Sequence, residues 1–381
     1  MKLALTVLCE NPLKRTGLTT MFREFIGHSL RLDPGLEWVV FAGPNQDLGV
    51  EDARIQYVRN FPANDRLRPR LLADHFLVSP RAQALGARAL LTVGFVPLRS
   101  RLPAIMHVNA LQHLSLANRI GGLREFYRSW MVKRGVAKAR LIITNSNFAS
   151  RQLLLAFPEC RGKLAMSYEG TQPQYRPEKA ADEARALQAR FKLEPGYLLW
   201  VSNFYQYKQA PLLLEGYAAL PENVRRQMPL VMVGGDWQGG LREANAAAQA
   251  TGISPDVRFL GWVEEEWLAP LYRHAVAYCL PSREETFGRT VTEAMSCGTP
   301  CLLNDIPIMH EVTEDHALLI DFAERDLVTQ SLRRLFEDAA LRQRLRAEGL
   351  AQAVKFSFEK LTRERIDAIR TALSRPERKH D

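Results

Sequence analysis

The chain has few cysteines, and their positions exclude the roles that cysteines usually play in secreted or zinc-binding proteins. Five are spread over 381 residues, at positions 9, 160, 279, 297 and 301, with neither a disulfide framework nor the spacing of a zinc site. The eight histidines form no H-x-x-x-H pair with a third ligand nearby. We therefore expect buried thiols in a reducing cytosol and no metal.

Long apolar runs are also missing. No segment approaches the roughly 20 apolar residues that a membrane-spanning helix needs. The N-terminal run MKLALTVLCE passes into Glu10 and Asn11 without a small-residue cleavage site, which predicts a first core strand rather than a signal peptide. With 46% hydrophobic residues and this length, we expect a cytoplasmic globular protein of two domains.

Negative charge is scarce in one part of the chain. Residues 54–163 hold 19 Lys/Arg and 4 Asp/Glu, a balance of +15, and since the whole chain is +9 the remainder sums to −6. A basic N-terminal half suits a phosphorylated acceptor, an anionic membrane surface or nucleic acid. Nucleic acid is not expected, because no RNP-type, zinc-finger or helix-turn-helix signature is present.

The segment Arg119–Arg140 is the densest basic stretch. Phe126, Trp130 and Val132–Val136 can form an apolar stripe under a basic face, which is typical of helices that lie on a membrane surface. An ordinary amphipathic helix with long basic side chains gives the same pattern. Both interpretations stay open, so peripheral contact with the inner face of the membrane is part of the prediction.

Strand-like and helical runs alternate along the chain, which predicts two doubly wound parallel sheets. The strands expected in the first sheet are 3–8, 38–42, 55–58, 88–93, 103–107, 141–144 and 163–168. Those expected in the second are 197–201, 230–234, 257–260, 275–280, 299–303 and 317–320. The turn-rich segment 168–179 reads as a linker, and residues 324–381 as helices. We predict domains at 1–170 and 171–358, and a C-terminal helix, 359–381, that returns to the first domain.

The stretch Pro281–Pro300, PSREETFGRTVTEAMSCGTP, is the most informative one. It follows a buried strand, so Glu285 in its loop can face a ligand at the carboxyl end of the sheet. A helix beginning near Arg289–Val291 offers free N–H groups to phosphate, with Glu293 predicted in its first turn. This arrangement fits a diphosphate flanked by two sugars. Thr290-x-x-Glu293 is also a capping box, and Glu285 alone can be a solvated charge.

The same stretch resembles the E-x7-E signature of the retaining nucleotide-sugar glycosyltransferases of family 4, which have the GT-B fold, two Rossmann-like domains facing each other across a cleft. The runs IITNSNFASRQLL, MSYEGTQPQYRP, VMVGGDWQG and VRFLGWVEEEWLAPLYRHA are similar to other segments of that family. The resemblance implies a retaining, metal-independent transfer of a sugar from a nucleotide-diphosphate sugar, and it covers nearly the whole chain.

The resemblance also implies a set of donor-binding residues. Glu285 would contact the transferred sugar and Glu293 the ribose, with Phe287, Gly288, Arg289 and Thr290 between them. In the family a Gly, an Arg and a Lys follow the first strand of the second domain. Lys208 matches the Lys, whereas Ser202 or Asn203 stands in place of the Gly and Gln206 or Tyr207 in place of the Arg. Arg283 is a weaker candidate for the diphosphate. Gly234 can let the backbone approach the nucleotide, and Val263 belongs to the run 261–263 that would line the base pocket.

On the acceptor side the resemblance points to the first domain. The family's glycine-rich loop corresponds to residues 10–17, where Gly17 remains. His107 ends an expected strand, where the family often has a histidine near the reacting centre, and His113 is the alternative. Asn145 and Ser146 are further candidates for contact with the acceptor, and Glu311 is similar to a family acid that supports the loop.

Several functions remain compatible with these residues. The first is transfer to a glycan or lipid-linked acceptor, with anionic acceptors among the candidates, in cell-envelope, exopolysaccharide or lipopolysaccharide synthesis. A sugar-nucleotide epimerase shares the fold but needs no acceptor. A catalytically degenerate nucleotide- or carbohydrate-binding regulatory subunit is the third, and the missing Arg near Lys208 favours it. The intact pair Glu285 and Glu293 argues against it.

Overall fold

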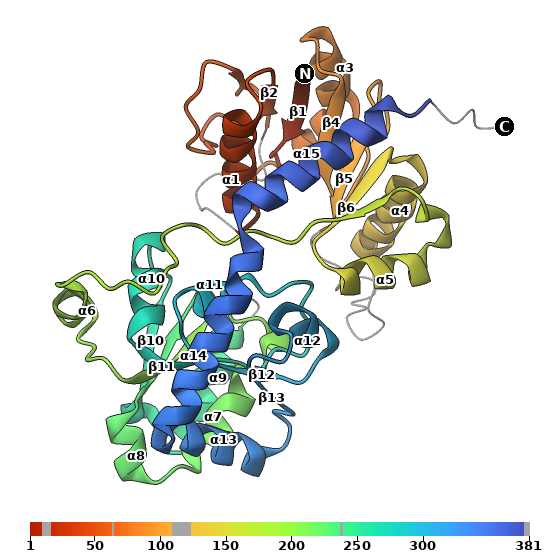
Figure 1. Ribbon diagram of the computed structural model, residues 1–381. Helices are drawn as coiled ribbons and strands as arrows, with labels where there is room; N and C mark the ends of the chain where they lie inside the picture. Colours follow the sequence, from red (N-terminus) through yellow and green to blue (C-terminus); the bar gives the residue numbers. More distant parts are fainter. Residues whose placement is uncertain (10–16, 63–64, 109–122, 237–238, 377–381) are drawn as a thin grey trace. The chain divides into compact units, whose positions relative to one another are not determined.

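The computed structural model describes residues 1–9, 17–62, 65–108, 123–236 and 239–376. They fold into two compact units (Figure 1). Unit 1 comprises Met1–Gly170 with Phe358–Asp381, and unit 2 comprises Thr171–Ser357. Each is described by itself below.

The described part of unit 1 contains a parallel sheet of seven strands in the order β3-β2-β1-β4-β5-β6-β7. The strands are β1 (Lys2–Thr6), β2 (Glu37–Phe41), β3 (Ile55–Val58), β4 (Ala89–Val93), β5 (Ala104–Val108), β6 (Leu141–Thr144) and β7 (Leu164–Met166). The central strands are aliphatic and almost fully buried, as expected for strands covered on both faces.

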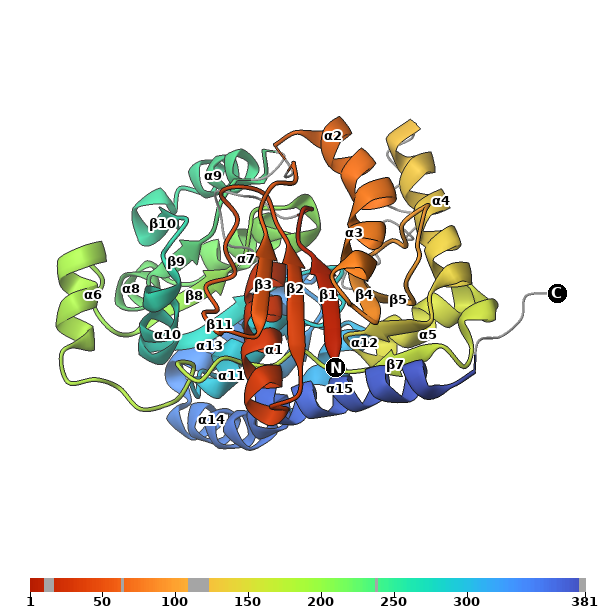
Figure 2. The same cartoon turned by 90° about the horizontal axis from the view of Figure 1, so that it is seen from above.

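Helices cover both faces of this sheet (Figure 2). They are α1 (Gly17–Leu32), α2 (Leu67–Leu72), α3 (Val78–Ala84), α4 (Leu123–Lys138), α5 (Asn147–Ala156) and α15 (Phe358–Ser374), with a π-helix η1 (Ala73–Leu77) and a 3₁₀ turn η4 (Pro158–Cys160). Leu3 and Leu5 pack with α1 and α15, whereas Ala4, which points the opposite way, packs with η1 and α3. The period-two alternation of the strand thus builds two separate cores.

The C-terminal helix α15 is held in unit 1 by a buried arginine. Arg365 donates to the Ser167 hydroxyl and to the Tyr168 carbonyl (3.1 Å), and its guanidinium lies 5.1 Å from the centre of the Phe25 ring. Burial lowers the pKa of Arg365 to about 10, so it keeps its charge at neutral pH. Helix α15 therefore completes the core of unit 1.

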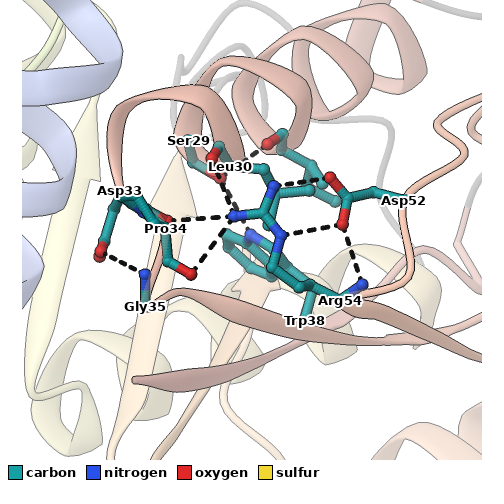
Figure 3. Close-up of polar contacts among 9 residues, drawn as sticks. Ser29, Leu30, Asp33, Pro34, Gly35, Trp38, Asp52 and Arg54 are labelled. Carbon is teal, nitrogen blue, oxygen red and sulfur yellow. Dashed lines mark hydrogen bonds and ion pairs between the residues drawn. The ribbon is translucent and has the colours of Figure 1, made fainter.

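A second arginine fixes the turn between α1 and β2 (Figure 3). The Arg54 guanidinium donates to both carboxylate oxygens of Asp52, at 2.9 and 2.6 Å, and to the Leu30 carbonyl at 3.0 Å. The hydrogen bond from Arg54 lowers the pKa of Asp52 to about 2. Nearby, the Trp38 indole donates to Ser29 at 2.9 Å. This network closes the open end of α1, whose last carbonyls have no partner within the helix.

The described part of unit 2 contains a parallel sheet of six strands in the order β10-β9-β8-β11-β12-β13. The strands are β8 (Tyr197–Val201), β9 (Leu230–Val233), β10 (Val257–Gly261), β11 (Ala275–Leu280), β12 (Cys301–Asn304) and β13 (Leu318–Ile320). The helices are α6 (Glu183–Phe191), α7 (Ala210–Ala218), α8 (Glu222–Gln227), α9 (Gly240–Ala250), α10 (Glu265–His274), α11 (Arg289–Ser296), α12 (Pro307–Thr313), α13 (Arg325–Glu337) and α14 (Ala339–Ala353), with 3₁₀ turns η5 (Gln206–Lys208), η6 (Ser254–Asp256) and η7 (Val354–Phe356).

The predicted fold class, two Rossmann-like doubly wound sheets, is confirmed, and every predicted strand has a counterpart. The expected strand 163–168 is shorter, at Leu164–Met166. Cys160, Cys279, Cys297 and Cys301 are buried thiols, and Cys9 is partly exposed. Among the described residues no helix is both long and apolar enough to cross a membrane.

The predicted apolar stripe of the basic segment is wrong for the described part, Leu123–Lys138. Val132 and Val136 are buried against Met106 and Ile142 of the sheet. Phe126 and Trp130 are exposed instead, so the apolar residues lie on two different faces of α4. Residues 119–122 lie outside the described residues.

Candidate functional site

The candidate site of unit 2 lies where the strand order changes direction. From β8 the chain adds β9 and β10 on one side, then crosses to add β11 on the other, so the switch point falls between β8 and β11. Loops that leave adjacent strands there run in opposite directions and leave space for a ligand at the carboxyl end of the sheet. Lys208 follows β8 and Glu285 follows β11.

Lys208 and Glu285 form an ion pair across the switch point. The Lys208 ammonium donates to Oε1 of Glu285, and the two side chains are 12% and 11% exposed. The two loops are also joined by their backbones, since the Arg283 N–H donates to the Tyr207 carbonyl at 2.9 Å. A flexible lysine that reaches a carboxylate here can reach a ligand anion at the same place, because it acts as a point charge.

Tyr207 supports this lysine. Its ring centre lies 5.2 Å from the Lys208 Nζ and 5.2 Å from the ring centre of Tyr205, on which it stacks. Burial, and next the charge of Glu285, raise the pKa of Tyr207, so its phenol stays neutral. Tyr207, like Gln206, is a candidate for the position at which the resemblance places an arginine, and an aromatic face attracts a cation but supplies none.

Helix α11 opens toward the same strand end. Its N-cap is Gly288, whose φ of 95° is in the left-handed region that favours glycine. Phe287 is buried against Phe356, with ring centres 5.5 Å apart, and anchors the loop before the helix. Gly288 supplies no capping side chain to this helix start, and a helix N-terminus attracts an anion through its backbone N–H groups and dipole.

Two details of the predicted helix start need correction. With Gly288 as N-cap, Thr290 lies inside the helix, so the alternative of a Thr290–Glu293 capping box is wrong. The Thr290 hydroxyl instead pairs with the Tyr278 hydroxyl at 2.7 Å. Glu293 lies beyond the first turn, where no acid is present, and not in it as predicted.

Glu293 is buried beside two residues that favour its charge. The Tyr272 hydroxyl donates to its Oε2 at 3.3 Å, and the Arg289 guanidinium lies 3.5 Å from its Oε1. Burial, and next the charge of Glu293, hold the pKa of Tyr272 well above its ordinary value, so Tyr272 keeps the proton that it donates. A carboxylate that is 6% exposed at the second turn of a helix is a costly arrangement, which suits a specific binding role.

The loops after β9 and β10 close one side of the site. Gly234 has a φ of 148°, and a Cβ there would lie 1.7 Å from the Ser202 carbonyl oxygen. The exposed Asn203 accepts a hydrogen bond from the Gly235 N–H at 3.2 Å. Val263 is buried, while its neighbour Trp262 is 56% exposed. Gly234 thus permits close backbone approach between two loops, which is the reason for a glycine here.

Several candidates of unit 1 lie at the carboxyl ends of the neighbouring strands β5 and β6. His107 is buried near the end of β5, with its ring centre 6.2 Å from that of Phe22. Gly17 is the exposed first residue of α1. The Asn145 amide donates to Glu169 at 3.0 Å, and Ser146 caps α5 by accepting from the Ala149 N–H at 2.9 Å. Asn145 and Ser146 therefore have structural roles.

Some predicted features cannot be located. The loop after β1, residues 10–16, and His113 lie outside the described residues. Glu311 lies in α12, the helix that follows β12. Within the ranges that the structure describes, no group of three or more His, Cys, Asp or Glu residues is arranged to hold a metal ion.

Sequence reasoning missed the tyrosines of this site. Tyr272 comes from α10 and contacts Glu293, while Tyr278 comes from β11 and joins Thr290 to the Val201 carbonyl (3.3 Å). Both stand in apolar runs that read as core. The available signal was chemical, because a buried tyrosine hydroxyl usually needs a partner.

Comparison with known proteins gives a family match within unit 2. Residues 183–352 match the family model described as "Glycosyl transferases group 1". The O-antigen chain mannosyltransferase B of Escherichia coli is 28% identical over 245 residues, which cover 64% of this chain and 64% of that protein. The matched region therefore spans less than two thirds of that relative.

Solved structures extend the likeness to the whole chain. Sucrose-phosphate synthase from Thermosynechococcus elongatus has a TM-score of 0.79 at 19% identity, covering 97% of this chain and 98% of that one. Anabaena HepE, solved in complex with UDP-glucose, has a TM-score of 0.72 at 16% identity, covering 97% and 100%. These similarities show that the two units together have the fold of the GT-B glycosyltransferases.

Proposed function

We propose that this chain, whose residues 183–352 match the family model of the glycosyl transferases group 1, transfers a sugar from a nucleotide-diphosphate sugar to an acceptor hydroxyl with retention at the anomeric carbon. The acceptor we propose is a glycan or lipid-linked intermediate of cell-envelope, exopolysaccharide or lipopolysaccharide synthesis. The mannosyltransferase of O-antigen chains among its relatives supports this setting.

The observation that carries the proposal is the grouping of Lys208, Glu285 and the start of α11 at one switch point. A diphosphate at the N-terminus of α11 would lie within reach of the Lys208 ammonium and of Arg289. The diphosphate would then compete with Glu285 for Lys208. Freed from that ion pair, the Glu285 carboxylate would bind hydroxyls of the transferred sugar.

Glu293 would bind the ribose. A carboxylate accepts hydrogen bonds from a pair of vicinal hydroxyls, and Tyr272 and Arg289 hold it in one orientation. Three further residues would border the nucleotide. They are Asn203 in the loop after β8, Gly234 in the loop after β9 and Val263 in the loop after β10. The bound UDP-glucose of Anabaena HepE, a protein of the same fold, supports a nucleotide-sugar donor.

In the proposed reaction, negative charge develops close to the cationic side chains of Lys208 and Arg289. As the glycosidic bond breaks, negative charge gathers on the leaving diphosphate, and positive groups already aimed there lower the barrier. The departing phosphate oxygen takes the proton of the acceptor hydroxyl. We include no metal in this proposal. His107 is proposed as a group near the reacting centre that can hydrogen-bond the sugar or the acceptor.

The test is a thermal-shift titration with a panel of nucleoside diphosphates and their sugars, because a ligand that binds the folded state raises its stability. We expect one base to stabilise the wild type selectively and Glu293→Gln to bind it at least about tenfold more weakly, since a hydrogen bond to a charged group contributes about 1.5–3 kcal/mol. Glu266→Gln, an exposed acid of α10, is the matched control and keeps wild-type affinity.

Two outcomes would favour the other functions. A protein that binds the nucleotide but releases no diphosphate with any acceptor is the degenerate regulatory subunit, which the tyrosine at position 207 supports. Conversion of the donor sugar without an acceptor identifies an epimerase. Binding of no nucleotide at all overturns the proposal.

A further inference from the structure

Two buried tyrosines hold the helix at the proposed donor site. Tyr272 of α10 and Tyr278 of β11 are fully buried, and their ring centres lie 5.5 Å apart in an edge-to-face arrangement. The Tyr272 hydroxyl bonds Glu293 of α11 at 3.3 Å. The Tyr278 hydroxyl bonds Thr290 of the same helix at 2.7 Å. Positions three apart on a helix lie on one face, so the two phenols together orient this face of α11.

The single proton of Tyr278 has two acceptors near it. The Tyr278 Oη lies 2.7 Å from the Thr290 Oγ1 and 3.3 Å from the Val201 carbonyl oxygen. A hydrogen bond from a hydroxyl to an oxygen is usually about 2.5–3.0 Å long, so the proton lies on the bond to Thr290. Burial holds the pKa of Tyr278 well above its ordinary value, so the phenol keeps this proton at neutral pH. Tyr278 is therefore a constant donor to Thr290.

This bond limits where the Thr290 proton can go. A hydroxyl that accepts from a phenol keeps its own proton for a different acceptor. Thr290 is half-buried at the second position of α11, after the N-cap Gly288, whereas Tyr278 lies in the core. The Thr290 proton therefore points away from the phenol, toward the start of the helix, where an anion is attracted.

The other threonine of α11 shows the usual alternative. The Thr292 hydroxyl donates to the Arg289 carbonyl of its own helix at 2.9 Å and accepts from the Thr171 hydroxyl at 2.9 Å. Its proton is thus used within the helix, as is common for threonine. Thr290 has the same side chain two residues away, but its partner is Tyr278. The two threonines therefore differ in the group that their proton can reach.

We propose, on the basis of the transferase function above, that Tyr278 is a positioning residue that directs the Thr290 hydroxyl at the diphosphate of the donor. When the bond between the anomeric carbon and the phosphate oxygen breaks, its electron pair stays on that oxygen. The acceptor oxygen forms the new bond and gives its proton to the departing phosphate. The Thr290 hydrogen bond to the diphosphate strengthens as this charge grows. Thr290 keeps its proton throughout, and Tyr278 touches no ligand.

Removal of single hydroxyls tests these contacts. Thr290→Val keeps the shape of the side chain, and Tyr278→Phe keeps the ring. We expect kcat/KM to fall about 10- to 100-fold in Thr290→Val, because a hydrogen bond to a charged group is lost, and about three- to tenfold in Tyr278→Phe, where the Thr290 hydroxyl is present but not directed. Thr290→Ser keeps the hydroxyl and should retain most of the wild-type rate.

A binding measurement accompanies the rates. Calorimetry with the nucleoside diphosphate of the base that the wild type prefers, and with the nucleoside of the same base, separates the diphosphate from the rest of the ligand. Affinity for the nucleoside diphosphate should fall about tenfold in Thr290→Val and less in Tyr278→Phe. Affinity for the nucleoside should stay at the wild-type value in both variants.

The double variant separates positioning from structural support. If Tyr278 acts through Thr290, then Tyr278→Phe in the Thr290→Val background should change neither kcat/KM nor affinity further. Tyr197→Phe is the matched control, because Tyr197 is a fully buried tyrosine of the neighbouring strand β8 whose hydroxyl donates to the Leu271 carbonyl at 2.8 Å. It should lower the unfolding temperature by an amount similar to Tyr278→Phe and leave kcat/KM unchanged.

Three results would overturn the inference. An equal loss of kcat/KM from Tyr278→Phe with and without the Thr290 hydroxyl would show that Tyr278 does not act through Thr290. Wild-type affinity and kcat/KM in either single variant would show that the diphosphate does not use this hydroxyl. A wild type that binds no nucleotide overturns the proposed function as well. If the wild type binds the nucleoside diphosphate but transfers no sugar, only the proposed function fails, and the two affinities still test the contact.

Discussion

Both units add two strands on one side of their first strand and then cross to the other side, so their switch points lie between β1 and β4 and between β8 and β11. At the second, the two loops bring Lys208 and Glu285 into contact. At the first, Thr6 at the end of β1 bonds Asp74, which is buried and paired with Arg70. One pair is reachable by a ligand, whereas the other network is enclosed.

The two switch points have the same topology, so this difference shows that the side chains determine whether a switch point can bind a ligand. In unit 2 the carboxyl end of the sheet holds carboxylates, a lysine and an uncapped helix start. In the described part of unit 1 the corresponding polar groups bond to residues of the same unit: Asp74 to Thr6, the Asn145 amide to Glu169 and Ser146 to the Ala149 N–H.

The largest effect on stability is expected from a comparison of two glycines that follow inner strands, Gly234 after β9 and Gly94 after β4. Gly234→Ala should destabilise unit 2 by about 4 kcal/mol, because strain at a positive φ adds to a Cβ that overlaps the Ser202 carbonyl at 1.7 Å. Gly94, which follows β4 with a φ of 68°, has no neighbour within 4 Å, so Gly94→Ala should cost only about 1 kcal/mol. Urea unfolding measures both; equal costs would show that backbone strain alone matters.

Lys208→Met tests the ion pair between Lys208 and Glu285 in unit 2. We expect turnover to fall about 10²–10³-fold, as when one charge-stabilising donor is removed from an active site, with little change in stability. The measurement is steady-state release of nucleoside diphosphate. Lys192→Met, at an exposed lysine of the same unit, should keep wild-type turnover. A wild-type rate in Lys208→Met would remove this lysine from the proposed mechanism.

Asp74→Asn tests the enclosed network of unit 1. Burial raises the pKa of Asp74 from 3.8 to about 6, although Arg70 and Thr6 act in the opposite direction. The stability that its proton contributes is therefore present in full below about pH 4 and is lost as the pH rises through about 6. The free energy of unfolding of the wild type relative to Asp74→Asn should fall by about 3 kcal/mol across this range.

Unfolding curves of the two proteins at several pH values measure that difference, with Asp65→Asn, at an exposed position of the same unit, as the control. A difference that stays constant with pH would contradict the enclosed character of Asp74. Turnover of Asp74→Asn at neutral pH should equal that of the wild type, which is the contrast with Lys208.

Ser146→Ala gives the smallest expected effect and separates a cap from an acceptor contact. The Ser146 hydroxyl caps α5, so its loss should cost about 1 kcal/mol of stability, with no change in KM for the acceptor. Asp182 precedes α6 without a capping hydrogen bond, so Asp182→Ala should change stability by less than about 0.5 kcal/mol. A raised KM in Ser146→Ala at unchanged stability would return Ser146 to the acceptor site.

The sequence predicted the alternation of strands and helices well because buried parallel strands are continuous apolar runs between turn signals. It missed α2, η1 and α3, where Pro69 and Pro80 interrupt the helical pattern. Proline is tolerated in the first turn of a helix, and a π-helical turn, η1, lies between the two helices. The helical character of residues 67–84 was therefore not visible in the sequence.

The spacing of Glu285 and Glu293 by itself determined that one carboxylate would lie in a loop and the other on the following helix, because strand, loop and helix are consecutive. Which groups hold those carboxylates was decided only by the tertiary structure. Tyr272 reaches Glu293 because α10 packs on α11, and Phe126 became exposed because Val132 and Val136 occupy the core side of α4. A sequence encodes local periodicity directly, whereas contacts between distant elements depend on how their faces pack.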